Sequence, residues 1–327
     1  MKKIVYILLV ISILLISINW KKDEFNPTVS AILQKNGATI PQHFKEKFTE
    51  TQIQQGKELV IQGRTKYQGK KSRPISKHFT CVTCHNTVKE TDNLKFANSA
   101  QQRLDYAYKT GIPFLQGSTF FGIVNREKWY NGDYQKKYGK LVDSARNDLG
   151  AAIQLCAQEC SQGRVLEQWE EDAILAYFRS LELKISDLTL PSSLIDSIQE
   201  NLKITSQRLK EFYPLNSPAT FTTPDQEKPF LAQLTGDYNN GRKIYDVSCK
   251  TCHKPNGVSF LILDDSKLTK QAFIKNLGSY KDADLRQITR WGTYPHSGHK
   301  PYMPNYTLEK LSHQQLKDLE TYLTTIE

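Results

Sequence analysis

The stretch Cys81-Val82-Thr83-Cys84-His85 is the feature around which the rest of this chain must fold. A Cys-x-x-Cys-His run is the attachment signature of c-type haem, because its two thiols bond to the porphyrin and its histidine binds the iron. The same pattern recurs as Cys249-Lys250-Thr251-Cys252-His253. We therefore predict two covalently attached haems, held by Cys81, Cys84, Cys249 and Cys252, with His85 and His253 as proximal iron ligands.

Methionine is scarce in this chain, and its positions limit the ligands of the two irons. Only Met1 and Met303 occur, so at most one haem can have the common His/Met ligation. Met303 follows the second motif in a loop before a predicted helix, and we predict it as the distal ligand of the second haem. His296 and His299, in the same loop, are the alternatives. A thioether ligand raises the reduction potential, so the second haem is expected to be the exit for electrons.

The second half of the chain has a simple order of elements. Residues 237–247 are predicted to form a helix in which Gly241 permits a close helix crossing, and a middle helix is expected over residues 283–290. Leucines between positions 308 and 323 predict an amphipathic C-terminal helix. With its haem motif and distal loop, this order resembles the cytochrome c family. The resemblance implies a helical domain closed around its haem.

The first half contains the same kinds of element with longer connections. A helix is predicted over residues 49–62, where Gly56 permits a second close crossing, and another over residues 166–183, whose apolar residues recur at helical spacing. A further helix is predicted over residues 149–160, and the aromatic residues between positions 86 and 145 are expected to pack around the haem. The predicted fold class is therefore all-α, with two cytochrome c-like helical domains.

The predicted boundaries divide the chain into five parts. Residues 1–20 are a signal peptide or membrane anchor, 21–48 a linker or arm, 49–185 the first cytochrome c-like domain, 186–229 a connecting segment and 230–327 the second domain. The N-terminal part has a basic start and an apolar run, but no small-x-small cleavage site. In either case the protein is expected on the periplasmic side of the cytoplasmic membrane, soluble or tethered through residues 4–20.

The net charge of +10 favours redox proteins as partners rather than nucleic acid. The lysines are scattered, and no arginine-rich run or basic-aromatic interleaving occurs, so binding to nucleic acid is not expected. A basic surface would attract an acidic redox protein, although neither the electron donor nor the acceptor can be identified. Two haems would also bring four propionates, so part of the basic excess is expected to compensate charge inside the protein.

The distal ligand of the first haem has to come from another residue type. Cys156 and Cys160 remain after the haem motifs, and a disulfide between them is geometrically unfavourable on a helix. The candidates are Cys156, Cys160, His78 and His43. We prefer Cys156, because a free cysteine just before the closing helix suits a distal ligand. Its thiolate would stabilise ferric iron and lower the potential, so electrons would pass downhill to the second haem.

A Cys/His-ligated haem domain followed by a His/Met domain resembles the dihaem thiosulfate dehydrogenases and the haem-bearing cytochrome of the bacterial sulfur-oxidation complex. The local match is the run Ile153-Gln154-Leu155-Cys156-Ala157-Gln158-Glu159-Cys160-Ser161-Gln162-Gly163-Arg164. In it Cys156 falls on the family's ligand cysteine, Cys160 on a serine and Ser161 on a methionine. The resemblance implies oxidation of a small sulfur anion at the first haem.

Several departures from that family weaken the enzymatic reading. Ala152 and Glu159 stand where the family has arginines, and an anionic substrate needs cationic donors. Arg146 and Arg164 are the remaining candidates for that role. A dihaem peroxidase is disfavoured, because no tryptophan-rich Asp-Gly-Arg stretch lies between the motifs. The prediction is an electron-transfer protein, with a thiosulfate dehydrogenase-like oxidoreductase as the alternative.

Overall fold

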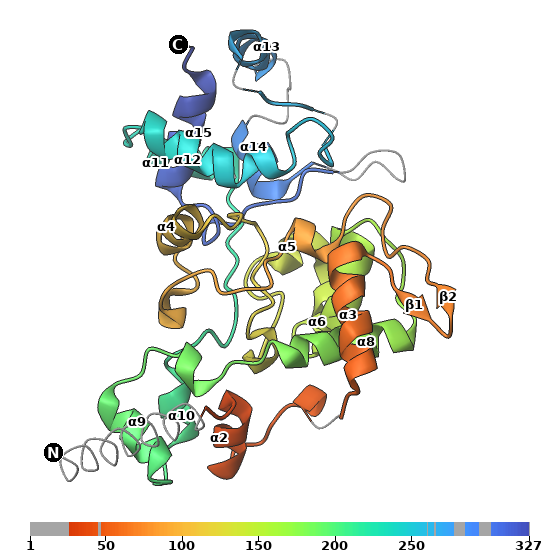
Figure 1. The fold of residues 1–327 in the computed structure, drawn as a ribbon. Helices are drawn as coiled ribbons and strands as arrows, with labels where there is room; N and C mark the ends of the chain where they lie inside the picture. Colours follow the sequence, from red (N-terminus) through yellow and green to blue (C-terminus); the bar gives the residue numbers. More distant parts are fainter. Residues whose placement is uncertain are drawn as a thin grey trace, which may run out of the picture.

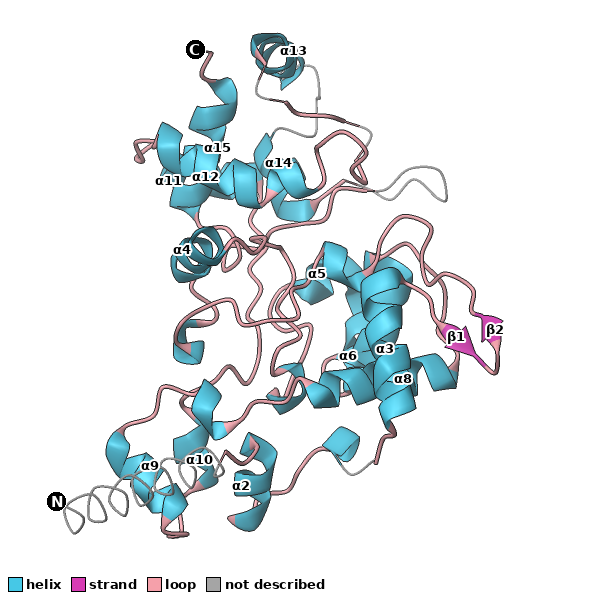
Figure 2. Cartoon of the chain, in the orientation of Figure 1, coloured by secondary structure: helices cyan, strands magenta, loops and turns pink. Residues whose placement is uncertain are grey.

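The regular secondary structure of the chain is almost all helix, with long loops between the helices, as its computed structural model shows (Figure 1, Figure 2). The structure describes residues 26–44, 47–259, 261–264, 266–277, 285–293 and 302–326. The predicted all-α fold class is confirmed; a two-stranded hairpin, β1 (Lys66–Tyr67) with β2 (Lys70–Lys71), pairs Lys66 with Lys71. The helices are α2 (Val29–Lys35), α3 (Glu50–Gln62), α4 (Ala100–Thr110), α5 (Tyr134–Tyr138), α6 (Val142–Ala145), α7 (Leu149–Leu155), α8 (Gln168–Ser180), α9 (Ser192–Gln199), α10 (Ser206–Lys210), α11 (Pro224–Leu231), α12 (Tyr238–Val247), α13 (Lys267–Leu277), α14 (Leu285–Trp291) and α15 (His313–Thr324).

Helix α3 crosses α8 at close range, as the glycine in its sequence predicts. Thr49 and Gln52 form a capping box that starts α3, and Gly63 ends it in the left-handed conformation. A methyl group at Gly56 would overlap the carbonyl oxygen of Ala173, so the two helix backbones touch at this point. This crossing holds the walls of the first haem region together.

The C-terminal region repeats the same crossing with α12 and α15. A methyl group at Gly241 would overlap the carbonyl group of Asp318, and it would also come close to Cβ of Tyr322. At the first crossing, a methyl group at Gly56 would come close to Cβ of Tyr177 in the same way. Each tyrosine lies four residues after the residue whose carbonyl group is contacted. The chain therefore contains two helix pairs that meet in the same way, one associated with each haem motif.

The helix α4 belongs to a different core from its neighbours in the sequence. Its Leu104 and Ala107, with Phe114 just after it, are buried in one hydrophobic cluster with α12 and α15 residues such as Ile244 and Leu319 (Figure 1). Gln315 of α15 also donates to the carbonyl of Ala100 at 3.1 Å. A segment between the two haem motifs thus contributes to the core of the C-terminal helices.

A third, smaller cluster is formed by the segments before and after the first haem region. Val29 and Ile32 of α2 pack with Leu194 and Ile198 of α9 and with Leu209 of α10. The backbone N–H of Val29 donates to Leu183 at 2.8 Å, which fixes α2 just beyond the end of α8. The arm and the connecting segment therefore pack on each other.

Some predicted features lie outside the described residues. The N-terminal signal or anchor over residues 1–20 is one of them, and His296 and His299 are others. The predicted middle helix corresponds to α14, whereas α13 is a helix that sequence reasoning missed. Within the described ranges, no helix has both the length and the apolar composition that crossing a membrane requires.

Candidate haem centres

The two Cys-x-x-Cys-His motifs adopt the same local structure. Each begins with a 3₁₀ turn, Cys81–Thr83 in the first motif and Cys249–Thr251 in the second. The N–H of His85 donates to Cys81 at 3.1 Å, and the N–H of His253 donates to Cys249 at 3.0 Å. Both motifs therefore fold back in the same compact turn.

Each motif histidine is held by a backbone carbonyl, with the second ring nitrogen left for iron. Nδ1 of His85 lies 2.7 Å from the carbonyl oxygen of Ser118, and Nδ1 of His253 lies 2.9 Å from that of Leu261. A carbonyl oxygen can only accept, so Nδ1 carries the hydrogen and Nε2 keeps its lone pair. Burial lowers the pKa of His85 to about 4, which keeps the ring neutral. Both rings are thus prepared as neutral metal ligands.

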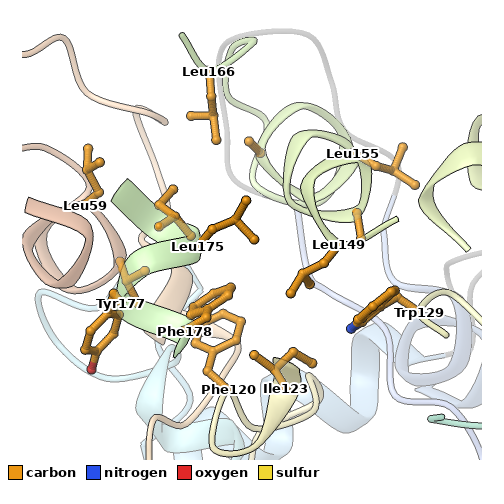
Figure 3. Close-up of a cluster of buried hydrophobic side chains, with 14 of the residues drawn as sticks. Leu59, Phe120, Ile123, Trp129, Leu149, Leu155, Leu166, Leu175, Tyr177 and Phe178 are labelled. Carbon is orange, nitrogen blue, oxygen red and sulfur yellow. The ribbon is translucent and has the colours of Figure 1, made fainter. Parts of the chain in front are cut away.

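The first motif opens onto an apolar cavity. The cavity has a volume of about 180 Å³ and is open to solvent, and Cys81, Cys84 and His85 line it. Figure 3 shows apolar side chains from several elements surrounding an open centre. The labelled residues that line the cavity are Leu59, Phe120, Ile123, Trp129, Leu149, Leu166 and Phe178.

Unpaired hydrogen-bond donors mark part of the cavity wall. Nε2 of Gln116, Nε of Arg126 and Nε1 of Trp129 are buried and have no partner within the part of the chain that the structure describes. Buried donors of this kind are costly unless an acceptor reaches them. Haem is an apolar macrocycle with two carboxylates at one edge. The apolar walls, the motif thiols and these donors therefore fit a haem.

Both spare cysteines line this cavity. After α7 the chain continues as a π-helical turn, Cys156–Cys160, in which the N–H of Ser161 donates to Cys156 at 2.9 Å. The predicted helix over residues 149–160 is therefore only α-helical as far as Leu155. Such π turns occur frequently at functional sites, where they redirect side chains. Here the turn brings Cys156 and Cys160 to the same cavity.

The two sulfur atoms have different surroundings. The hydroxyls of Tyr130 and Tyr138 each lie 3.4 Å from Sγ of Cys160. Hydrogen bonds from the Cys156 thiol, and then from these hydroxyls, lower the pKa of Cys160 to about 6. The same thiol–thiol hydrogen bond raises the pKa of Cys156, and burial adds to the effect. Cys160 thus receives hydrogen bonds from three donors, and Cys156 is one of them.

The two histidine candidates for the first iron are not among the residues that line this cavity. Nε2 of His43 is 2.9 Å from the carbonyl oxygen of Val124, and its ring packs on Phe44 and Trp129. His78 packs edge-on against Phe79, and its Nε2 is buried. The geometry therefore favours a cysteine over either histidine as the distal ligand.

The arginines predicted to receive an anion are also placed elsewhere. Arg164 forms two 2.6 Å hydrogen bonds with Glu170 and donates to the carbonyls of Arg73 and Pro74. Neither Arg164 nor Arg146 is among the residues that line the cavity. Arg126 does line it, and sequence reasoning missed this residue because no motif marks it.

The loop that carries Met303 follows α14 and forms part of the wall of the first cavity. Met303 is tied to the end of α14, because its N–H donates to Oγ1 of Thr293 at 2.7 Å and its carbonyl accepts from Thr293 at 3.0 Å. Its neighbours Tyr302, Pro304 and Asn305 line the first cavity, but Met303 does not. Met303 thus stays the predicted ligand of the second iron, on a loop that also forms a wall of the first site.

Several hydrogen bonds join this loop region to the first haem region. The hydroxyl of Tyr302 donates to the carbonyl of Cys160 at 2.6 Å. Nζ of Lys137 donates to the carbonyl of Trp291 at 2.8 Å and to Oδ1 of Asn305 at 2.6 Å. The segments that carry the predicted distal ligands of the two irons are therefore in direct contact.

Comparison with known families identifies the C-terminal part of the chain. Residues 238–327 match the family model of cytochrome c. No curated protein is significantly similar to the chain. The matched range includes the second motif and Met303. The chain therefore contains a cytochrome c domain, which implies a covalently bound c-type haem with iron and haem-based electron transfer.

Proposed function

We propose that this protein is an exported dihaem c-type cytochrome that passes electrons between two covalently bound haems. The observation that carries the proposal is the duplicated histidine geometry. In both motifs a carbonyl holds Nδ1, at 2.7 Å for His85 and 2.9 Å for His253, and Nε2 is left for iron. The repeated helix crossings at Gly56 and Gly241 support two related haem regions in one chain.

The residues that would hold the groups follow from this geometry. Cys81 and Cys84 would bind the first haem and Cys249 and Cys252 the second, each beside its motif histidine. When bound, the haems would supply one-electron redox chemistry. The protein would orient them and exclude water from the first site with apolar walls. The partners would be a donor and an acceptor protein on the periplasmic side of the membrane.

Haem counting tests the proposal directly. The native protein is expected to carry two haems, and the Cys81→Ala/Cys84→Ala and Cys249→Ala/Cys252→Ala double variants one each. The measurement is the intact mass of the purified chain together with the absorbance of the reduced haems. A native protein with the mass of a single haem would contradict the proposal.

A second candidate function is oxidation of a small sulfur anion at the first haem. The placement of Cys156 and Cys160 in the cavity supports it. However, Arg126 is the only lysine or arginine among the described residues lining this cavity. It is linked through hydrogen bonds to the residue that holds His85, and not to the cysteines. Its Nη1 donates to Ser217, whose hydroxyl is 2.8 Å from that of Ser118. The charge of Lys137 acts on Cys160, but its Nζ is already held by the carbonyl of Trp291 and by Oδ1 of Asn305, which favours a carrier.

Adding thiosulfate to the protein distinguishes the two candidate functions, electron carrier and oxidoreductase. Thiosulfate added to the oxidised protein is expected to leave the haem absorbance unchanged, since Lys137, whose charge acts on Cys160, already donates to Trp291 and Asn305. Ascorbate, added to the same sample, should then reduce the second haem and show that the protein is competent. Reduction by thiosulfate at a rate proportional to enzyme would establish the oxidoreductase instead.

A further inference from the structure

A group of buried cations lies beside the first haem cavity and has too few anions to balance it. Arg103 is 1% exposed, Arg126 4% and Lys310 5%, and the buried carboxylate among them is that of Glu90, 6% exposed. Arg103 and Arg126 belong to the segment between the haem motifs, whereas Lys310 comes from the matched cytochrome c domain. The group therefore joins the two halves of the chain.

Both oxygens of the Glu90 carboxylate already accept hydrogen bonds from neighbouring side chains. Oε2 of Glu90 accepts from Nε of Arg103 at 3.1 Å, and Oε1 accepts from Asn86 at 2.9 Å. Asn86 directly follows His85, so this pair lies on the histidine side of the first haem. Glu309 also acts on Lys310, but its two oxygens accept from the N–H and hydroxyl of Thr220.

The cations keep free donors that point to a missing acceptor. Nη1 of Arg103 and Nε of Arg126 are buried and have no hydrogen-bond partner among the described residues. Within the described residues, Nζ of Lys310 has no hydrogen bond or ion pair either. Burial lowers the pKa of Lys310, and the charges of Arg103 and Arg126 lower it further. An uncompensated buried charge is unfavourable, so a bound anion would stabilise the whole group.

One member of the group, Arg126, connects it to the haem cavity. Arg126 and Gln116 line the cavity, next to Ser118, whose carbonyl holds His85. The chemistry required is an anion with several acceptor oxygens that enters from this cavity. A haem seated on His85 brings two carboxylates of this kind.

We propose that Arg103, Arg126 and Lys310 form the site for the propionate carboxylates of the first haem, so that the C-terminal domain completes the first haem site through Lys310. This inference rests on the proposed function, because it requires a haem on the first motif. Arg126 would donate to a carboxylate from Nε, and Lys310 and Arg103 would balance its charge. The buried positive charge of Lys310 would also favour ferrous over ferric iron and raise the reduction potential of the first haem.

The test compares two buried lysines of the same domain. Lys310→Met is expected to lower the potential of the first haem by about 59 mV or more, a tenfold change in its one-electron reduction equilibrium. Lys310→Arg should keep the native potential. Lys270→Met is the matched control, because Lys270 is 8% exposed but donates to the carbonyl of Thr325 at 3.2 Å. The potentials are measured by redox titration of the full-length haem-loaded chain, with intact mass as the haem count.

Each outcome is decisive. Equal potentials in the native, Lys310→Met and Lys270→Met proteins would overturn the site. A saturable shift of the native potential with added sulfate, absent in Lys310→Met, would assign the group to a free anion instead of a propionate. If Lys310→Met does not fold, redox-difference infrared spectra of the native protein decide: ionised propionate bands support the site, and a protonated carboxyl band overturns it. A native chain with one haem would instead contradict the proposed function.

Discussion

Replacing Cys156 with alanine is expected to abolish thiolate ligation at the first iron and to raise the reduction potential of that haem. The reason is that a thiolate stabilises ferric iron, and Cys156 is the cavity cysteine without a hydroxyl donor of its own. The measurement is electron paramagnetic resonance of the fully oxidised protein, in which the low-spin signal of a thiolate-ligated haem should be lost. The loss should be accompanied by a positive shift in a redox titration.

Cys160→Ala is the matched control for this result. Its sulfur accepts from Tyr130 and Tyr138 at 3.4 Å, so we expect the thiolate signal to persist with small changes from the altered packing. A signal that survives in Cys156→Ala and disappears in Cys160→Ala would show that the ligand assignment is wrong. A signal absent from the native protein would exclude thiolate ligation by either cysteine.

Gly241→Ala is expected to destabilise the protein by about 3 kcal/mol, the upper end of the usual cost of overpacking. The added methyl group would overlap the carbonyl oxygen of Asp318, so α12 and α15 would have to move apart. The measurement is the midpoint of urea unfolding. Because both atoms of the overlap belong to rigid helix segments, no side chain can move away to relieve it.

Gly111→Ala is the control that separates the cost of overpacking from the cost of backbone strain. Gly111 has φ of +74°, but a methyl group there would meet nothing within 4 Å. Gly111→Ala should therefore cost only about 1 kcal/mol, the price of the left-handed conformation. Equal losses in the two variants would mean that the close crossing of α12 and α15 does not limit stability.

The local features of this protein could be predicted from its sequence because each depends on a few neighbouring residues. The haem motifs, the glycines at the helix crossings and the all-α class follow from spacing and periodicity. The role of Arg126 and Lys310 could not be predicted in this way, because buried cations become conspicuous only when their missing partners are known. The π turn at Cys156–Cys160 was also missed, since its pattern of residues is equally compatible with an α-helix.

The placement of α4 was unpredictable for another reason. No helix is predicted from the sequence over residues 100–110, and the apolar surface that covers α4 comes from α12 and α15, more than a hundred residues later. Sequence patterns identify which face of a helix is buried and not which partner buries it.

This placement of α4 has a consequence for how the protein acquires its fold. A chain is made from its N-terminus, so Leu104, Ala107 and Phe114 emerge well before the helices that cover them. The first haem region can then complete α3 and α8 while α4 still has an exposed apolar face. Contacts between such distant segments close late and slowly. Packing of the C-terminal helices is therefore the final step of folding for both halves. A fragment ending before α12 would keep the apolar face of α4 exposed and would be prone to aggregate.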